Sequence, residues 1–578
     1  MAKLVQLEIK NYRSIENLVL NFDPASNLVC FIGRGDSGKT TILEAISAVL
    51  SPVWNLAFHD TDFYNCDHTR SIEILASLID LPDKLINANR FGMHLRGFDL
   101  TTKAISDDLT DDEANAGLEH LITIKLQVDE DLEPKWTLTN SREQEDIPVN
   151  ASERELLNCC LIADHVDRHF SWNKGNPLYA LLKAMDKKSE PEEKNVIIRS
   201  MRAAKVHIDK HTFSELQEVT GIVAMQAAAL GLNILNSGNT LDFKELSIKD
   251  ARISLHEELI PFRLKGKGSK RLISLAIQLA LVKNGGMMLV DEVEQGLEPD
   301  RIRHLVRVLK ENVGGQVFLT THSRDAITEL GAEPLCLILK DKDLALIEGK
   351  SLNYTYESLT KAVRACPEAF FAKKIIVCEG ATEIGICRAL DKYRKKQGKK
   401  PMSFKDCAYV DGTGNSLIDR IQAIAGADMG TALLCDSDNT EVNGRKQELL
   451  RQGILIFDCE DSNCIETQVF KDLPWKGVQD LIDFAQKTHK KNDIKAIESA
   501  VKEKLPNGFK FDQGWLQVDH PDLRSAISFV SITKNKEWFK RVDLGEFLGD
   551  VIFNHFEAMA DTTHLKKTLT TLSNWIDN

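Results

Sequence analysis

The feature that most constrains this chain is the segment GRGDSGKT at residues 33–40. It matches the pattern G-x-x-x-x-G-K-[S/T] at every fixed position. An apolar run at 28–32 precedes it and predicts a buried strand, and the run at 42–50 that follows predicts a helix. This order of strand, glycine-rich loop and helix suits phosphate binding, because N–H groups at a helix N-terminus attract anions.

The loop supplies a set of residues for holding a nucleotide. Lys39 is expected to reach the β- and γ-phosphates, and the hydroxyl of Thr40 is expected to bind Mg²⁺. The predicted nucleotide-binding residues are Gly33, Gly35, Ser37, Gly38, Lys39, Thr40 and Thr41.

Length and composition limit the kind of protein that surrounds this loop. A chain of 578 residues predicts about three to four domains. No apolar run reaches the roughly 18 residues that span a bilayer, so we expect no membrane segment. The 12 cysteines form no C-x-x-C pairs, which favours a reducing cytoplasm. A net charge of −13 argues against broad coating of DNA, but it allows a local basic groove or a metal-mediated phosphate site.

A second motif, which is acidic, follows another buried strand. The run GMMLV at 286–290 ends in Asp291 and Glu292, and the run at 316–320 ends in Thr321, His322 and Ser323. Adjacent ionised acids at the end of a buried strand are costly without a cation. We therefore expect Asp291 to hold Mg²⁺ through water and Glu292 to orient the attacking water.

Between these motifs the pattern changes, and this change sets the predicted domain boundaries. From about 151 to 232 the pattern is helical, and the strand and loop signals resume near 263. The predicted parts are an ATPase segment at 1–150, a helical and dimerising insertion at 151–245, a second ATPase segment at 246–365 and an α/β domain at 366–578.

The C-terminal part carries a second set of carboxylates at strand ends. A strand at 373–378 ends in Glu379, with Glu383 one helical turn further on, and a strand at 431–435 ends in Asp436 and Asp438. Converging carboxylates repel one another without cations, and their oxygens suit Mg²⁺ or Mn²⁺. Two such ions can activate water and stabilise the leaving oxygen of a phosphodiester. A pair of solvated surface acids is the simpler alternative for Asp436 and Asp438 alone.

The motifs of the first half resemble those of ABC-type ATPases of SMC and recombination-repair proteins. The resemblance rests on Arg13 in NYRS, the loop at 33–40, Asp291 and Glu292, GLEP at 296–299 and THS at 321–323. It implies ATP as the nucleotide and His322 as a sensor of the γ-phosphate. The segment GKGS at 266–269 stands where the family has a signature loop, but it lacks the usual LSGGQ, so ATP-driven closure of two heads is in doubt although dimerisation is not.

The second half resembles a Toprim domain, and the motif order resembles that of the overcoming-lysogenisation-defect (OLD) nucleases. These include the Gabija nuclease and retron-associated relatives, which act in bacterial antiviral defence. The fold class implied is α/β: an ABC-type P-loop ATPase with a helical insertion, followed by a C-terminal Toprim domain of Rossmann-like topology.

The resemblance also implies roles for individual residues. Glu379, Glu383, Asp436 and Asp438 would bind metal, with Asp461 and Glu466 as further ligands. Lys536 would stabilise the transition-state phosphate, and Lys534 and Lys540 are alternatives. Mg²⁺ is the expected ion, with Mn²⁺ and Ca²⁺ as alternatives. No tyrosine in the motifs suits strand passage, so water is the expected nucleophile.

The function that the sequence favours is an ATP-regulated, metal-dependent endonuclease acting on DNA, as the effector of a defence system. An ATP-gated nucleic-acid sensor with a structural Toprim domain, and an RNA (tRNA) nuclease, are the alternatives. The expected partners are nucleic acid and further copies of the chain, in a homodimer or higher oligomer. For a retron-associated member the resemblance implies a reverse transcriptase with its RNA–DNA product, and no residue decides this point.

Overall fold

The computed structural model describes most of the chain, with the longest gaps between residues 185 and 254. The described residues are 2–107, 117–142, 144–163, 166–170, 176–184, 199–200, 202–207, 210, 220, 255–257, 260–282, 285–311, 314–340, 347–351, 356–412, 417–427, 429–460, 462–488, 494–506, 509, 514–534 and 537–578. The predicted ligand Asp461, the predicted lysine Lys536 and most of the predicted helical insertion lie outside them. The chain forms two compact units, Met1–Leu161 with Gly285–Asn578, and Ile162–Asn284.

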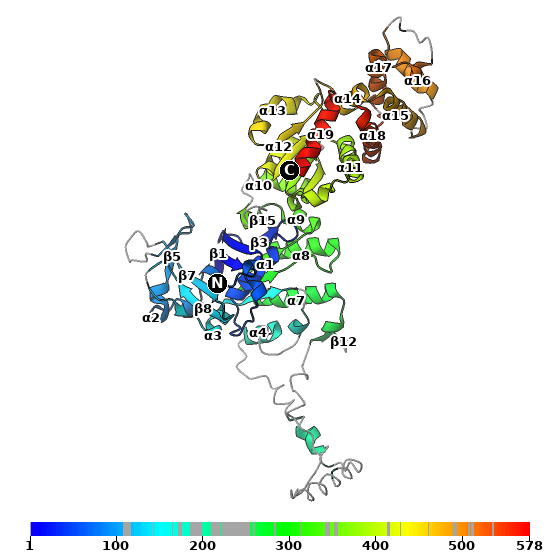
Figure 1. The fold of residues 1–578 in the computed structure, drawn as a ribbon. Helices are drawn as coiled ribbons and strands as arrows, with labels where there is room; N and C mark the ends of the chain where they lie inside the picture. Colours follow the sequence, from blue (N-terminus) through cyan, green and yellow to red (C-terminus); the bar gives the residue numbers. More distant parts are fainter. Residues whose placement is uncertain are drawn as a thin grey trace, which may run out of the picture. The chain divides into compact units, whose positions relative to one another are not determined.

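The N-terminal part of the first unit contains an antiparallel sheet (Figure 1). Its strands follow the order β2 (Ile15–Asn21), β1 (Lys3–Tyr12), β4 (Ile72–Ile79), β7 (Glu119–Val128), β5 (Arg96–Phe98) and β6 (Ile105–Ser106), with β8 (Pro134–Thr139) beside β7 and β9 (Ile147–Pro148) beside β8. The strands predicted at 4–9, 71–80 and 121–128 are all present.

The strand before the glycine loop belongs to a second sheet, whose centre is parallel. The order is β10 (Cys159–Ile162), β13 (Met287–Val290), β14 (Gln316–Thr320), β3 (Leu28–Ile32), β15 (Leu335–Lys340) and β16 (Ile347–Ser351). Neighbouring strands from β13 to β15 are parallel, and β16 is antiparallel to β15. Every residue of β3, β13 and β14 is buried, as expected for parallel strands covered on both faces.

Strand β10 differs from the helical pattern that the sequence predicts from residue 151 onwards. A four-residue apolar run has no period of its own, so pairing with a sheet edge can override the helical prediction. Here the carbonyl of Asn158, just before β10, accepts a hydrogen bond at 3.1 Å from the N–H of Met287, the first residue of β13. The four-part division into domains stays a prediction.

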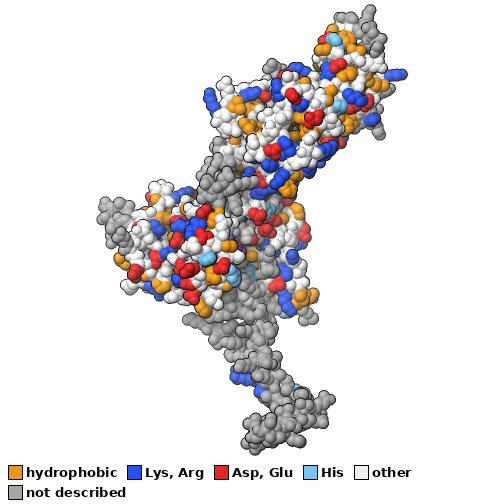
Figure 2. Space-filling view, in the orientation of Figure 1, with side chains coloured by type: hydrophobic (Ala, Val, Ile, Leu, Met, Phe, Trp, Pro, Cys, Tyr) orange, Lys and Arg blue, Asp and Glu red, His pale blue; other side chains and the backbone are white. Residues whose placement is uncertain are grey.

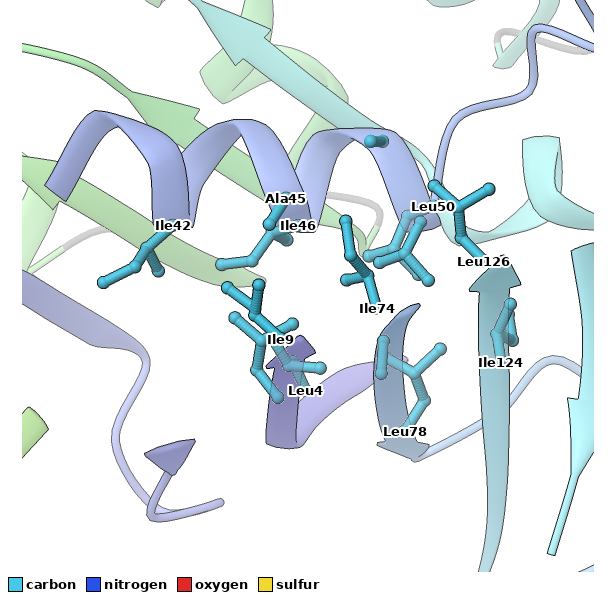
Figure 3. Packing of buried hydrophobic residues seen from close by; sticks show 14 of the residues in the cluster. Leu4, Ile9, Ile42, Ala45, Ile46, Leu50, Ile74, Leu78, Ile124 and Leu126 are labelled. Atoms are coloured by element: carbon cyan, nitrogen blue, oxygen red, sulfur yellow. The ribbon is translucent and has the colours of Figure 1, made fainter. Parts of the chain in front are cut away.

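Helix α1 (Lys39–Val49) packs against both sheets and fixes the position of the glycine loop. Figure 3 shows Ile42 and Ile46 of α1 facing Ile9 of β1, with Ile74 of β4 and Leu126 of β7 close by. The loop therefore leads into a helix held by one continuous apolar core. The other described helices of this part are α2 (Ala88–Phe91), α3 (Ala151–Arg154), α8 (Pro299–Glu311), α9 (Arg324–Leu330) and α10 (Tyr356–Ala365).

In the second unit α4 (Pro177–Ala184) and α7 (Lys267–Val282) pack together, and β11 (His256–Glu257) and β12 (Ile260–Pro261) form a short hairpin. The buried helix predicted at 272–282 is therefore present, and it begins within the GKGS segment. No described helix of the chain is both long and apolar enough to cross a membrane.

Residues after 366 form a separate parallel sheet with the strand order β18 (Cys407–Asp411), β17 (Lys374–Cys378), β19 (Gly430–Leu434) and β20 (Leu455–Phe457). The chain therefore runs outward in opposite directions from β17 and β19. This switch point is where open α/β sheets bind ligands, at the carboxyl ends of their strands. The helices of this part are α11 (Ala381–Lys396), α12 (Leu417–Ala425), α13 (Thr440–Arg451), α14 (Ile465–Asp472), α15 (Trp475–Thr488), α16 (Ile494–Lys504), α17 (Pro521–Ser531), α18 (Val542–Asn554) and α19 (His564–Asp577).

Glycines allow α11 and α18 to cross at very short range. A Cβ atom on Gly385 of α11 would lie 2.2 Å from the backbone nitrogen of Glu546 and 2.3 Å from the carbonyl carbon of Gly545. Backbone atoms cannot move aside as flexible side chains can, so only glycine fits there. The crossing matters for the site, because α11 carries Glu383 and α18 begins two residues after Lys540.

We expect Gly385→Ala to destabilise the C-terminal part by about 1–3 kcal/mol, the usual cost of inserting a methyl group into a filled contact. Gly444→Ala is the matched control, since Gly444 also lies within a helix but a Cβ there would have no neighbour within 4 Å. That control should be neutral or slightly stabilising. Thermal melts of both variants test this, and equal melting temperatures would contradict the close crossing.

Candidate functional site

Parallel pairing brings the ends of three strands of the second sheet to one edge. Residue Phe31 of β3 pairs with Thr320 of β14, and Val290 of β13 pairs with Leu319 of β14. The glycine loop, the Asp291–Glu292 pair and the Thr321–Ser323 segment follow directly after these residues. Three sequence-distant motifs therefore meet at the carboxyl edge, as they must if they act on one ligand.

The glycine loop has the backbone that phosphate binding requires. A Cβ atom on Gly33 would lie 2.5 Å from the carbonyl oxygen of Ile338, so a side chain has no room there. Gly38 adopts a left-handed conformation with φ 94° and begins α1 without a side-chain cap. The first N–H groups of this 11-residue helix are thus free of a competing side chain, which suits an anion.

Lys39 is buried and turned onto its own loop. Its Nζ donates to the carbonyl oxygens of Gly33 and Arg34 at 3.1 and 2.6 Å, and lies 3.3 Å from the Ser37 hydroxyl. Burial lowers the pKa of Lys39 to about 8, although nearby carboxylates, Asp291 first among them, oppose this shift. A polyphosphate would give this ammonium group the negative partner that burial makes favourable, so the residues fit a nucleotide.

The predicted Mg²⁺ residues are in direct contact. The Thr40 hydroxyl donates to both oxygens of Asp291, at 3.0 and 3.2 Å, and the Thr320 hydroxyl lies 2.7 Å from Asp291 Oδ1. Glu292 is held in a left-handed conformation with φ 47°, and its N–H donates to Thr320 Oγ1 at 2.7 Å. This leaves the Glu292 side chain exposed at the edge, where a water-orienting group would be needed.

Glu294 links the second and third motifs, a role that the motif patterns did not reveal. It accepts hydrogen bonds from the Thr321 hydroxyl at 2.7 Å and from the His322 N–H at 2.6 Å. Burial, together with the positive charge of Lys39, lowers the pKa of His322, so its imidazole is neutral at pH 7. Only the pairing of β13 with β14 brings Glu294 to this place.

A second group of polar residues lies at the switch point of the C-terminal sheet. Glu379 follows β17, and its two carboxylate oxygens accept hydrogen bonds from the Asp436 N–H and from Asn439 Nδ2, both at 2.9 Å. Asp436 follows β19, and its Oδ1 accepts a hydrogen bond from the Ile465 N–H at 2.7 Å. The Glu379 carboxylate thus ties the ends of β17 and β19 together, and the Asp436 carboxylate ties the end of β19 to the start of α14.

Burial and mutual repulsion raise the proton affinity of two of these acids. Burial, followed by the charges of Glu383, Glu466 and Glu379, raises the pKa of Asp436 to about 8. Burial, followed by Glu466 and Glu379, raises the pKa of Glu383 to about 7, although backbone N–H groups oppose this. The group is therefore short of positive charge, which is the condition that a bound cation would relieve.

Lys540, one of the alternative lysines, lies close enough to this group for the carboxylate charges to act on it. Partial burial alone would lower its pKa, but the charges of Glu466, Asp436 and Glu383 outweigh that effect and raise it. The Phe539 carbonyl accepts from the Thr382 hydroxyl at 3.2 Å, and that hydroxyl lies 3.4 Å from Glu466 Oε1. This contact ties the segment before α18 to the carboxylates, and no spacing in the sequence indicated it.

The structure thus brings together Glu379, Glu383, Asp436 and Glu466, whereas Asp438 is exposed to solvent. Within the described part of the chain, no three His, Cys, Asp or Glu side chains are arranged to ligate one ion. The electrostatics and the donor set still fit a divalent cation, and binding would require these side chains to rotate toward one point.

Family models of AAA ATPases match two stretches of the chain. One described as an AAA ATPase domain matches residues 2–155, and an AAA domain model described for AbiEii toxins of type IV TA systems matches 198–329. The OLD nuclease of Thermus scotoductus is 24% identical over 412 residues, which cover 65% of this chain and 71% of that protein. The chain is a relative of the OLD nucleases. The predicted resemblance is confirmed, and the first half is a P-loop ATPase fold.

Further similarities are to RecF and to an Smc head domain. RecF of Lactococcus lactis is 54% identical over 44 residues, or 8% of this chain and 12% of that protein. The Smc head domain of Pyrococcus furiosus bound to ScpA is 14% identical with a TM-score of 0.35, and covers 62% of this chain and 99% of that one. A structure of RecF in the RecFOR pathway is 13% identical with a TM-score of 0.31, and covers 60% and 98%.

We expect the metal-free protein to lose stability as the pH rises from about 4 to 8. In this window folded Asp436, with a pKa near 8, keeps a proton that the unfolded chain has released at its ordinary value of 3.8, so higher pH favours unfolding. Melts in EDTA from pH 5 to 9 measure the decline. Asp436→Asn should make the melting temperature depend less on pH. Asp438→Asn, which changes the exposed neighbour, should leave the pH dependence as in wild type. An equally steep decline in Asp436→Asn would contradict the assignment.

Proposed function

We propose that this OLD relative is an ATP-regulated endonuclease that uses divalent metal ions to hydrolyse phosphodiester bonds of nucleic acid. We assign the C-terminal α/β part, 366–578, as its Toprim nuclease domain. The observation that carries the proposal is the carboxylate group at the switch point of the parallel sheet, in which Glu383 and Glu466 are buried and Glu379 and Asp436 are half-buried.

A structural role explains this group poorly. Buried carboxylates in a merely structural setting are paired with cations, because an unpaired buried charge is strongly destabilising. Here Asp436 and Glu383 have instead raised pKa values, near 8 and 7, and they repel one another. Perturbed acids gathered at a ligand-binding edge are a mark of functional sites.

The chain's own residues have distinct parts in the proposed reaction. Bound Mg²⁺, with Mn²⁺ or Ca²⁺ as alternatives, would supply Lewis acidity and an activated water. Glu379, Glu383, Asp436 and Glu466 would hold the ions, with Asp438 and Asp461 as further ligands. Lys540 would stabilise negative charge on the phosphate, since the charges of the carboxylates act on it; Lys536 and Lys534 remain the other candidates.

The polymer favoured is DNA, which the OLD resemblance suggests, and RNA such as tRNA is the alternative because the same chemistry serves both. On the face that Figure 2 shows, Lys and Arg side chains are interspersed with Asp and Glu. With a net charge of −13, the phosphate backbone would be held at a local site rather than over a broad basic surface.

The ATPase part would regulate cleavage. Lys39, Thr40, Asp291, Glu292 and His322 would bind and turn over ATP with Mg²⁺, in a homodimer or a higher homo-oligomer. We propose a cytoplasmic effector of antiviral defence, with a reverse transcriptase and its RNA–DNA product as the partner if the protein is of the retron-associated kind.

One observation favours a second function, an ATP-gated sensor that binds nucleic acid with a structural Toprim domain. No three acidic, histidine or cysteine side chains of the described residues are arranged around a single ion. In that case the carboxylates would serve the fold, and binding would occur without cutting in every metal.

Cleavage of plasmid DNA and of matched RNA in Mg²⁺ or Mn²⁺ tests the proposal. We expect wild type to cut, and Asp436→Asn to cut at least about 100-fold more slowly, the magnitude typical of a lost transition-state stabiliser. Glu441→Gln, an exposed acid in the first turn of α13, is the control and should cut normally. Equal cutting by wild type and Asp436→Asn would exclude this site, and binding without cutting in all metals would favour the sensor.

A further inference from the structure

We infer that Asn439 is a positioning residue that holds the carboxylate of Glu379 for metal binding, an inference that rests on the proposed function. Its Nδ2 donates to Glu379 Oε1 at 2.9 Å. Its Oδ1 accepts hydrogen bonds from the N–H groups of Glu441 and Val442, both at 3.1 Å. One side chain therefore joins the N-terminus of α13 to the end of β17.

The helix determines which end of the amide faces Glu379. The first N–H groups of α13 need an acceptor, so the Asn439 oxygen must point to them. The NH₂ end is then directed at Glu379, and the amide cannot flip without losing the cap. This makes Asn439 a fixed donor rather than an adaptable one.

The contact orients Glu379 without exhausting its capacity to bind a cation. A carboxylate has about four lone-pair sites, and here each oxygen accepts one hydrogen bond, from Asn439 or from the Asp436 N–H. The remaining lone pairs stay available on an oriented group. Hydrogen-bond partners of metal ligands typically change metal affinity by about 10- to 100-fold.

The simpler role for Asn439 is a helix cap alone, and the chain allows the two roles to be separated. Serine caps helices about as well as asparagine but has no NH₂ group to reach Glu379. Asn439→Ser should therefore keep the melting temperature of the metal-free protein while it weakens metal binding. Asn443→Ser is the matched control, because Asn443 lies on the same helix and donates to the Ser437 carbonyl, not to a carboxylate.

The test measures Mn²⁺ binding to the full chain in two ways. Electron paramagnetic resonance reports binding directly, and the Mn²⁺ concentration that gives half-maximal cleavage reports it through activity. We expect Asn439→Ser to bind Mn²⁺ about 10-fold more weakly, with a smaller change for Asn443→Ser. Wild-type affinity in Asn439→Ser would overturn the positioning role and leave the metal site intact. No Mn²⁺ binding by wild type would overturn the proposed function and this inference with it.

A separate set of contacts carries a second inference: we propose that Arg34 of the glycine loop transmits nucleotide binding to the C-terminal site. Within the first unit, Arg34 Nε lies 2.9 Å from Asp406 Oδ1, and Nη2 donates to the Ser403 carbonyl at 2.5 Å. Asp406 directly precedes β18 and Ser403 lies in the short 3-10 turn before it, so a side chain of the phosphate loop is bonded to the segment that leads into the C-terminal sheet.

The Arg34–Asp406 contact is linked on one side to the phosphate-binding lysine and on the other to the strand that precedes Glu379. The Arg34 carbonyl accepts a hydrogen bond from Lys39 Nζ at 2.6 Å. The Asp406 carbonyl accepts from the N–H groups of Lys373 and Lys374, at 2.9 and 3.0 Å, where β17 begins. Strand β17 then ends at Cys378, and Glu379 is the next residue. Hydrogen bonds, an ion pair and the covalent chain of β17 therefore connect the phosphate-binding lysine with the first carboxylate.

Nucleotide would act on this path through Lys39. The ammonium group has three donors and now contacts the Gly33 carbonyl, the Arg34 carbonyl and the Ser37 hydroxyl, so binding a phosphate would exchange one of these contacts. In the proposed coupling the Arg34 carbonyl is the one released, which changes the bonding of the loop that carries the guanidinium. A ligand shifts an equilibrium only through contacts that differ between two states, and the Lys39–Arg34 bond is such a contact. Couplings of this kind are typically about 5- to 150-fold.

Hydrogen exchange of residues 366–379, with and without a non-hydrolysable ATP analogue, tests the proposal independently of cleavage. We expect the analogue to change the exchange rate in wild type and not in Asp406→Ala or Arg34→Ala, while a fluorescent analogue still binds Asp406→Ala. Arg324→Ala is the control, because Arg324 pairs with Glu368 at 3.7 Å near the same strand but does not touch the loop.

The coupling would be overturned if Asp406→Ala kept the wild-type exchange response. It would also be overturned if the wild type bound the analogue and its exchange rate did not change. Neither result would bear on whether the carboxylates cut nucleic acid. A double variant, Arg34→Ala with Asp406→Ala, should respond like either single variant, because the two side chains act through one contact.

Discussion

Both candidate sites depend on one constraint, the alignment of parallel strands by their backbone hydrogen bonds. Parallel strands end at the same edge, so residues that follow them converge whatever their separation in sequence. In the sheet that contains β3, β13 and β14, this brings Gly33, Asp291 and His322 together. In the C-terminal sheet it sets Glu379 beside Asp436, with an N–H of one strand end donating to the carboxylate of the other.

The remainder of each site is supplied by elements packed against these edges. Helix α1 lies between two apolar faces and holds the phosphate loop at the edge of the sheet. The close crossing of α11 and α18 at Gly385 holds Glu383 near the segment that carries Lys540. Apolar side-chain packing in the first case and a backbone contact in the second, rather than a surface ion pair, determine where the charged group stands.

Much of this could be predicted, because short motifs at strand ends report on local structure. The strands at 28–32, 286–290, 316–320 and 373–378 were predictable from apolar runs bounded by glycine or acids. Strand β10 was not, since a run of four apolar residues takes its conformation from the sheet edge beside it. Asp438 matched the motif as well as Asp436 did, yet it is exposed, because alternate residues after a strand need not stay on one side.

The sequence by itself determined the P-loop, the order of the motifs and hence the kinship with OLD nucleases, since these depend on residue types at fixed short spacings. Only the tertiary structure decided which groups meet across long separations: Glu294 with His322, Asn439 with Glu379, Lys540 with the buried carboxylates, and Arg34 with Asp406. The physical reason is that such contacts depend on strand register and helix crossing, and both are set by packing of the whole core.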